Sequence, residues 1–253
     1  MLAFGPRTYD QPLTIGDVVT GPVVGILGGM EPAATADFYA KLISRTPAAV
    51  DQQHLRVIIW SDPTVPDRSW ALTGEGPDPT PWLRRGAHGL RAAGAGVLVM
   101  PCNTAHAFMA GIIGELDIPV VDMIAAVTAY VRSCLPDVGV VGLLATRGTI
   151  GAGLYQDRLG AAGVDVLVPE EDIQSAAVDS AIHAVKSGRC DAAVAERLLV
   201  AGEHLVRRGA QAVIAGCTED PLGLATDGLR RPLVDSSLVL ADAVLDYVAP
   251  RGP

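Results

Sequence analysis

The chain contains one local pattern twice, and this repeat constrains its fold more than any other feature of the sequence. Cys102 follows the apolar run at residues 97–100, and Cys217 follows a second run at residues 212–215. The length and branched side chains of both runs are typical of buried parallel strands. Because ligands bind beyond the carboxyl ends of such strands, we predict that the two thiols face one another across a cleft.

Other landmarks repeat at a nearly constant offset: Gly25 pairs with Gly142, Gly94 with Gly209, and Pro119 with Pro232. Each half therefore contains a glycine turn, a strand, a cysteine turn, a helix and a short strand after a proline. This pattern predicts an α/β fold of two pseudo-symmetric lobes. Each lobe is a short parallel sheet flanked by helices, and the active site is expected in the interlobe cleft.

We assign the first lobe to residues 21–130 and the second lobe to residues 131–235. A C-terminal helix at 236–249 is predicted to pack back on the first lobe, and residues 1–20 form a leader that is peripheral to both. Further strands are expected at residues 23–27, 56–60, 138–144 and 164–168. The segment at 62–81 is rich in Pro, Gly and Asp and too long for an ordinary connection, which favours a functional loop or lid.

Composition limits the partners that the protein can have. The 253 residues are 49% hydrophobic, and the net charge is −9 with scattered basic residues. This charge pattern offers no positively charged surface that would bind nucleic acid or an anionic membrane. No apolar run is long enough to span a bilayer, and residues 1–19 lack the features of a secretory signal, so we expect a cytoplasmic protein.

Four cysteines in a chain of this length do not form a disulfide framework, so we expect free thiols in a reducing compartment. Cys134 and Cys190 have no polar turn and no repeat partner, and we interpret both as core residues. His106 is interpreted as a structural residue rather than a catalyst. Neither a Cys-x-x-Cys motif nor a histidine cluster indicates a metal site, so no metal is predicted.

Five motifs follow one another along the chain: Gly25-Ile-Leu-Gly-Gly-Met, Pro66-Asp67-Arg68, Met100-Pro-Cys-Asn-Thr-Ala-His, Gly142-Leu-Leu-Ala-Thr and Ala215-Gly-Cys-Thr-Glu. In content and order they resemble the aspartate racemase branch of the aspartate/glutamate racemase family, over nearly the whole chain. The resemblance implies a cofactor-independent amino-acid racemase that needs no pyridoxal phosphate, uses two cysteines and forms a homodimer. It also implies that Cys102 acts on the D form of the substrate and Cys217 on the L form.

Inversion of an amino acid at Cα requires a base on one face and an acid on the other, and two like groups serve both directions. We therefore assign these roles to Cys102 and Cys217, which are expected to titrate as a coupled pair. A nearby helix N-terminus or hydrogen-bond donor would help a thiol to ionise at neutral pH. The enolate that forms beside the substrate carboxylate needs further donors, for which Asn103, Thr104 and Thr218 are candidates.

Arg68 and Lys186 resemble family positions that bind substrate carboxylates, and arginine is suited to bidentate binding. As alternatives, Arg68 is a surface charge and Lys186 is a helix-end residue near the negative pole. The predicted substrate-binding residues are Met30, Arg68, Asn103, Thr104, Thr146, Thr149, Lys186, Thr218 and Glu219. Glu219 has an alternative role as a brace for the second cysteine turn.

Aspartate or glutamate is the expected substrate. Glu31 departs from the family pattern, which usually has glycine there; we favour an outward carboxylate that helps to cap a helix, because an inward one would repel an acidic substrate. The alternatives within the same superfamily are a racemase of broad specificity, a hydantoin racemase, and a related decarboxylase or isomerase. A one-thiol decarboxylase is disfavoured by the second cysteine. A non-catalytic protein that binds a small acid is the remaining alternative.

Overall fold

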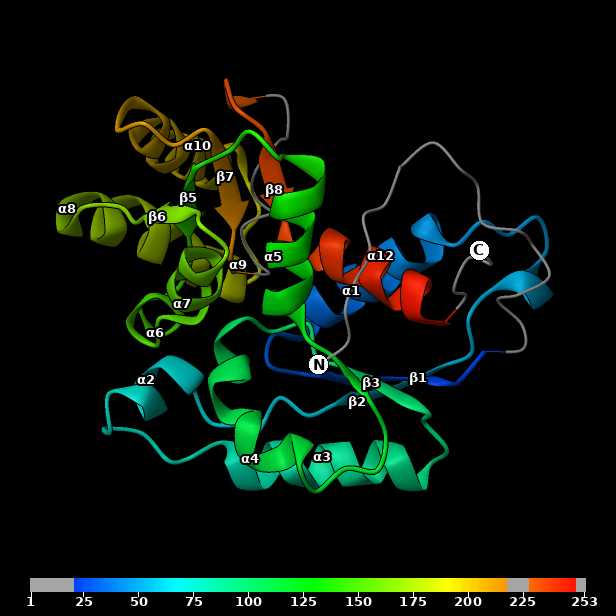
Figure 1. The fold of residues 1–253 in the computed structure, drawn as a ribbon. Coiled ribbons are helices and arrows are strands. Elements are labelled where there is room, and N and C mark those ends of the chain that lie inside the picture. Colours follow the sequence, from blue (N-terminus) through cyan, green and yellow to red (C-terminus); the bar gives the residue numbers. More distant parts are fainter. Residues whose placement is uncertain (1–20, 218–227, 249–253) are drawn as a thin grey trace.

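Each half of the chain builds a four-stranded parallel sheet, and the two sheets have the same strand order. The computed structural model describes residues 21–217 and 228–248, and its sheets run β2-β1-β3-β4 and β6-β5-β7-β8 (Figure 1). The strands are β1 (Val24–Gly28), β2 (Val57–Ser61), β3 (Val97–Val99), β4 (Val120–Val121), β5 (Val140–Leu144), β6 (Asp165–Leu167), β7 (Ala212–Ala215) and β8 (Leu233–Asp235). The shared order confirms the predicted two-lobed α/β fold.

The strands form where the sequence offers short apolar runs. β1, β3 and β7 are buried along their whole length, as expected for parallel strands that are covered on both faces. β3 pairs with β1, and β7 pairs with β5, in parallel. Each cysteine turn therefore follows the equivalent inner strand of its sheet.

In the first lobe, α1 (Pro32–Arg45) and α3 (Thr80–Ala92) lie on opposite faces of the sheet (Figure 1). Alternation along β1 explains this arrangement, because successive side chains of a strand point to opposite faces. Ile26 packs in the cluster that includes Phe38 of α1, whereas Leu27 packs in the cluster that includes Leu83 of α3. The shorter elements of this lobe are η1 (Asp51–Gln53), α2 (Arg68–Leu72), η2 (Thr104–Phe108) and α4 (Ala110–Ile113).

In the second lobe, α10 (Ala192–Arg207) and α7 (Leu154–Ala161) belong to two separate apolar clusters. The other elements are α6 (Arg147–Gly151), α8 (Glu171–Ile173), the π-helix η3 (Gln174–Asp179) and α9 (Ser180–Lys186). Among the described residues, no helix combines the length and the apolar character that crossing a bilayer requires.

Two helices connect the lobes. α5 (Met123–Cys134) leads from the first sheet to the second, and α12 (Ser236–Val248) follows the last strand of the second sheet. α12 lies against α1 and also against α5 (Figure 1). The domain boundary between residues 130 and 131 stays a prediction, and that position lies inside α5. The predicted leader at 1–20 lies outside the described residues.

The structure corrects the interpretation of two cysteines as core residues. Cys190 is exposed and Cys134 is only partly buried. Cys190 lies in the connection between α9 and α10, directly before Asp191, whose carboxylate caps α10. Cys134 is the last residue of α5. Cys134 thus ends a helix and Cys190 lies in a connection between helices, and neither is a core position.

Candidate active site

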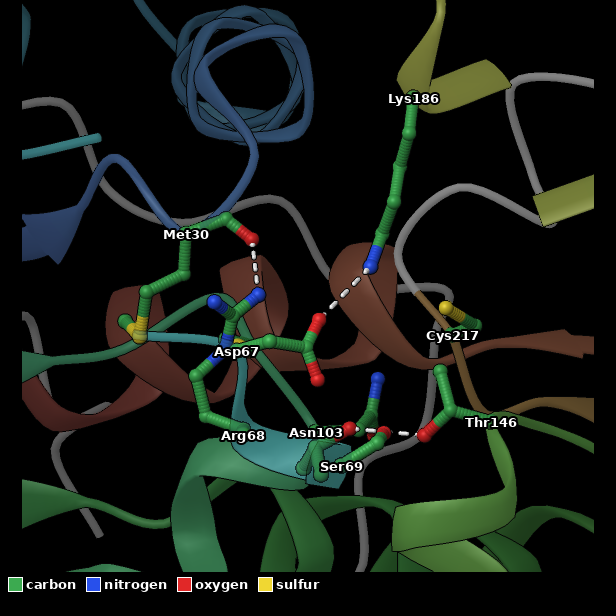
Figure 2. A pocket seen from close by; sticks show the side chains of 10 residues that line it. Met30, Asp67, Arg68, Ser69, Asn103, Thr146, Lys186 and Cys217 are labelled. Carbon is green, nitrogen blue, oxygen red and sulfur yellow. Dashed lines mark hydrogen bonds and ion pairs between the residues drawn. The ribbon is translucent and has the colours of Figure 1, made fainter. Parts of the chain in front are cut away.

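A pocket between the two lobes is lined by residues of both (Figure 2). Its walls are formed by Met30, Asp67, Arg68, Ser69, Cys102, Asn103, Thr104, Thr146, Lys186 and Cys217. The space open to water inside it is about 10 Å³, which is roughly what one water molecule needs. An amino acid is larger than this space, so the side chains of the wall would have to move for a ligand of that size.

Cys102 and Cys217 reach this pocket from different lobes. Cys102 lies beyond the carboxyl end of β3, and Cys217 lies directly beyond β7 at the equivalent place in the other sheet. Their exposed fractions are 7% and 5%, and both are free thiols. The structure thus brings the two predicted catalytic residues to one cavity, where each is largely shielded from bulk water.

His106 supports the Cys102 turn from the side of the protein core. Its Nδ1 lies 2.9 Å from the carbonyl oxygen of Cys102, and its Nε2 accepts a 3.2 Å hydrogen bond from the backbone N–H of Met123. Because Nε2 accepts, the neutral ring has its proton on Nδ1 and donates it to Cys102. Burial lowers the pKa of His106, which favours this neutral form. These contacts agree with a structural role for His106.

Asn103 lines the pocket, but its side-chain amide is held by the protein. Its Oδ1 accepts a 2.6 Å hydrogen bond from the phenol of Tyr155, and its Nδ2 donates to Ser236 Oγ at 3.2 Å. The side chain is almost fully buried, with 2% exposed. Asn103 is therefore better suited to holding the turn that contains Cys102 than to forming hydrogen bonds with a ligand.

Three threonine hydroxyls form a closed triangle across the lobes. Thr104 Oγ1 lies 2.9 Å from both Thr146 Oγ1 and Thr149 Oγ1, and the last two are 3.1 Å apart. Thr146 also caps α6 by accepting from the backbone N–H of Thr149. Thr104 and Thr146 line the pocket, whereas Thr149 is fully buried and supports them from outside the lining.

Arg68 is fixed at the pocket wall by backbone carbonyl groups. Its Nη2 donates to the carbonyl oxygen of Met30 at 2.8 Å (Figure 2), and its Nη1 donates to that of Pro66 at 3.1 Å. Arg68 begins α2, and Asp67 caps this helix by accepting from the backbone N–H of Trp70. The segment predicted as a loop or lid thus contains a short helix that presents Arg68 to the cavity.

Lys186 approaches the pocket from the second lobe, at the end of α9. Its Nζ lies 3.9 Å from Asp67 Oδ2 of the first lobe (Figure 2). The side chains are 32% and 46% exposed, so water screens this long ion pair and its contribution to stability is small. Its importance lies in placing an ammonium group and a carboxylate on facing walls of one cavity.

Two residues of the pocket wall, Asp67 and Ser69, are absent from the predicted binding set. Both are neighbours of Arg68, and a helix begins at this point of the chain. For Asp67 the available signal was its position directly before Arg68, because aspartate is a common residue at the N-cap of a helix. The predicted residues Thr218 and Glu219 lie outside the described residues.

The first glycine turn packs closely against the backbone of Asp62. Gly29 has a φ of 88°, and an added Cβ would overlap the backbone of Asp62, so only glycine fits there. Glu31 occupies the N-cap position of α1, but its side chain makes no capping hydrogen bond, contrary to our expectation. Instead, Thr35 Oγ1 donates to the carbonyl oxygen of Glu31 and accepts from the N–H of Gly29.

Comparisons with known proteins agree with this architecture. A family model described as Asp/Glu/Hydantoin racemase matches residues 27–244. The structure is similar to that of the Picrophilus torridus aspartate racemase, with a TM-score of 0.81 and 29% sequence identity over 92% of this chain and 96% of that chain. It also shares its fold with the Francisella tularensis glutamate racemase, at a TM-score of 0.67 and 19% identity over 90% of this chain and 81% of that one.

Two curated relatives extend the comparison. The broad specificity amino-acid racemase RacX of Bacillus subtilis is 26% identical over 238 residues, which are 90% of this chain and 99% of that protein. A shorter stretch of 93 residues, 36% of this chain, is 42% identical to a protein from Pectobacterium carotovorum and spans only 60% of that relative's length. Because the family model matches most of its length, the chain belongs to the Asp/Glu/hydantoin racemase family.

Proposed function

We propose that the protein is a cofactor-independent amino-acid racemase in which Cys102 and Cys217 act as acid and base. The observation that supports this most directly is the single pocket that both thiols line, each from the equivalent strand end of its lobe. Inversion by two bases needs two like groups on either side of one carbon atom, and a duplicated lobe supplies them. Membership of a racemase family supports the same reaction class.

In the proposed reaction one cysteine is a thiolate and the other is a thiol. The thiolate removes the α-proton, and the electron pair of the broken C–H bond passes into an enolate that extends over the substrate carboxylate. The opposite thiol then donates its proton to the other face of Cα, which gives the inverted amino acid. The two sulfurs have now exchanged protonation states, and proton exchange with solvent or turnover of the other enantiomer restores the first state.

For the substrate we propose aspartate or glutamate. Arg68 and Lys186 place two cations in the pocket wall, and these substrates have two carboxylates. The hydroxyls of Thr104 and Thr146 are donors for the carboxylate that becomes an enolate. The 29% identity to an aspartate racemase over nearly the whole chain supports this substrate class.

A racemase of broad specificity is the second candidate, and the position of Asp67 favours it. Its carboxylate lies 3.9 Å from Lys186 Nζ and offsets part of that positive charge. A substrate with a single carboxylate would then be enough to balance the charge that remains, because Asp67 already lies beside Lys186. The 26% identity to a broad-specificity racemase, over nearly its full length, supports this candidate.

A panel of amino acids separates these candidates. The purified protein is incubated in ²H₂O, without pyridoxal phosphate, with each enantiomer of aspartate, glutamate, alanine and lysine, and the products are resolved by chiral chromatography and mass spectrometry. An aspartate or glutamate racemase inverts the acidic pair only, with one deuterium gained at Cα. Inversion of all four amino acids identifies broad specificity. The absence of both inversion and deuterium exchange would refute the proposal and favour a binding protein.

We further propose that the protein acts in the cytoplasm as a homodimer. The free thiols of Cys102 and Cys217 need a reducing compartment to stay available. Dimer formation is implied by the family resemblance, and exposed apolar side chains on α1 and β2, such as Ile43 and Ile59, offer a surface for it. Sedimentation equilibrium tests the assembly, and a monomer at micromolar concentration would contradict it.

A further inference from the structure

A buried chain of hydrogen bonds joins three distant parts of the sequence beside Cys102. The phenol of Tyr155, on α7, donates to Asn103 Oδ1 at 2.6 Å, and Asn103 Nδ2 donates to Ser236 Oγ at 3.2 Å. The exposed fractions of Tyr155 and Ser236 are both 0%. Buried polar groups keep their partners because an unmade hydrogen bond there is costly. The three side chains therefore fix one another's positions.

This chain crosses from one lobe to the other. Tyr155 belongs to the second lobe, whereas Asn103 is the residue after Cys102 in the first. Ser236 lies at the start of α12, where the chain leaves the last strand of the second sheet. Asn103 thus lies between Tyr155, which is in the second lobe, and Ser236, which follows the last strand of that lobe. These two contacts tie the position of Asn103 to the second lobe.

A second link runs from the same helix to the carbonyl group of Cys102. Arg158, one turn beyond Tyr155 on α7, donates to Asp122 Oδ2 at 2.6 Å. Asp122 caps α5, and the first N–H of α5, that of Met123, donates to His106 Nε2. His106 Nδ1 in turn donates to the carbonyl oxygen of Cys102. One helix of the second lobe therefore braces two successive residues of the Cys102 turn.

From these contacts we infer that Tyr155 is a positioning residue that sets where Cys102 stands relative to Cys217. The inference rests on the two-cysteine reaction proposed above. Cys217 belongs to the second lobe, as Tyr155 does, so a rigid link from Tyr155 to the Cys102 turn fixes the separation of the two thiols. Proton transfer at Cα depends steeply on such placement. Tyr155 does not line the pocket, so it acts through Asn103 and not on the substrate.

Tyr155→Phe is the variant that tests this inference, because it removes one oxygen atom and keeps the buried ring. The loss of a donor for Asn103 should loosen the Cys102 turn and lower kcat/KM by about tenfold. The equilibrium constant between enantiomers is one, so kcat/KM must fall equally in both directions. A fall in rate alone therefore does not identify the affected thiol, and a second measurement is needed.

Primary deuterium isotope effects on kcat/KM, measured with each α-deuterated enantiomer, identify the thiol. If Cys102 alone is misplaced, its proton transfer becomes more rate-limiting. The isotope effect then rises for the enantiomer that Cys102 deprotonates and falls toward one for the other. Cys102→Ser and Cys217→Ser, each of which weakens one base, calibrate the two directions. Tyr155→Phe should follow the pattern of Cys102→Ser. Unchanged isotope effects, or the pattern of Cys217→Ser, would overturn the inference.

Matched controls separate positioning from general stability. Tyr247→Phe removes the hydroxyl of a partly buried tyrosine that packs on the same core, and it should leave both isotope effects unchanged. Asn103→Ala breaks the same link from its other end, so the double variant with Tyr155→Phe should be no slower than Asn103→Ala alone. Additive losses would contradict a shared link. If Tyr155→Phe proves too unstable, the isotope effects of Asn103→Ala alone decide the question, and a pattern unlike that of Cys102→Ser would overturn the inference. A wild-type protein that racemises nothing would refute the proposed function, whereas an active wild type with an unaltered Tyr155→Phe refutes only this inference.

Discussion

Gly148 of the second lobe lies directly against Ser69 of the first. A Cβ added to Gly148 would be 2.6 Å from Ser69 Oγ and 2.8 Å from Ser69 Cα, closer than real side chains approach. Gly148 is in α6 and Ser69 is in α2, the helix that begins with Arg68. The close approach of the lobes beside the pocket therefore depends on the absence of a side chain at residue 148.

Gly148→Ala is expected to push α2 away from α6 and to move Arg68 from the pocket wall. The KM for the substrate should rise about tenfold, equivalent to roughly 1.4 kcal/mol of lost binding, and steady-state kinetics measures it. Gly151→Ala is the matched control, because it lies in the same helix with open space at its Cβ position. An equal effect of both substitutions would show that α6 itself, and not its contact with Ser69, determines binding.

Cys102→Ala and Cys217→Ala should each abolish racemisation of every substrate. A site with one thiol can remove a proton from one face but has no group of the same kind to protonate the other face. The loss is expected to be at least about a thousandfold in kcat, measured by polarimetry or chiral chromatography. Cys134→Ala, at the partly buried end of α5, is the control and should retain activity. Near-normal turnover in either pocket variant would contradict the two-base assignment.

Arg68→Ala should weaken the binding of aspartate more than that of alanine. The guanidinium lies in the pocket wall and is oriented by Met30 and Pro66, so a second substrate carboxylate can add to this arrangement. We expect the KM for aspartate to rise by about tenfold or more, with a smaller change for alanine. Arg68→Lys keeps the charge and tests whether the planar group is needed. An unchanged preference for aspartate over alanine in Arg68→Ala would remove Arg68 from substrate recognition.

His106 makes the folded protein less stable in acid. Burial lowers its pKa in the folded protein below the ordinary value of 6.5, whereas unfolding exposes the ring and restores that value. Between the two pKa values the unfolded chain binds more protons, so the free energy of unfolding falls as the pH drops below about 6.5. The slope from this group approaches about 1.4 kcal/mol per pH unit at most.

Urea unfolding between pH 7.5 and pH 5 measures this slope. His106→Gln should be less stable than the wild type at neutral pH but should show a shallower dependence on pH. His88→Gln, which replaces a histidine whose side chain is 49% exposed, is the matched substitution at the surface. Equal slopes for the wild type and His106→Gln would show that this ring does not govern the response to acid.

Much of the fold was predictable because the repeat constrains it. The predicted strands are present, with ends that differ by at most two residues, since short apolar runs before polar turns leave few alternatives in a parallel sheet. The repeated landmarks also predicted two similar lobes, and the common strand order of the two sheets agrees with that prediction. Family membership confirmed the expectation of a racemase, whereas substrate, assembly and location stay proposals.

The sequence predicted that Cys102 and Cys217 meet in one cleft, and both line one pocket, whereas their catalytic roles stay a prediction. The site was not predictable where distant segments meet. Tyr155 is an apolar position of α7 by its sequence pattern, and only the fold brings its phenol to Asn103. Asn103 was predicted as a donor for the substrate, but its side chain bonds to Tyr155 and Ser236. The sequence does not show which polar groups pair with each other in the interior.

The two connections between the lobes determine how the pocket can open. α5 and α12 lie side by side, while the short helices α2 and α6 of the two lobes contact each other beside the pocket. From this arrangement we expect the two neighbouring connections to act as a hinge when the lobes separate. Such a motion would admit a ligand on the side of α2 and α6, and closing would bring Cys102 and Cys217 back to one pocket.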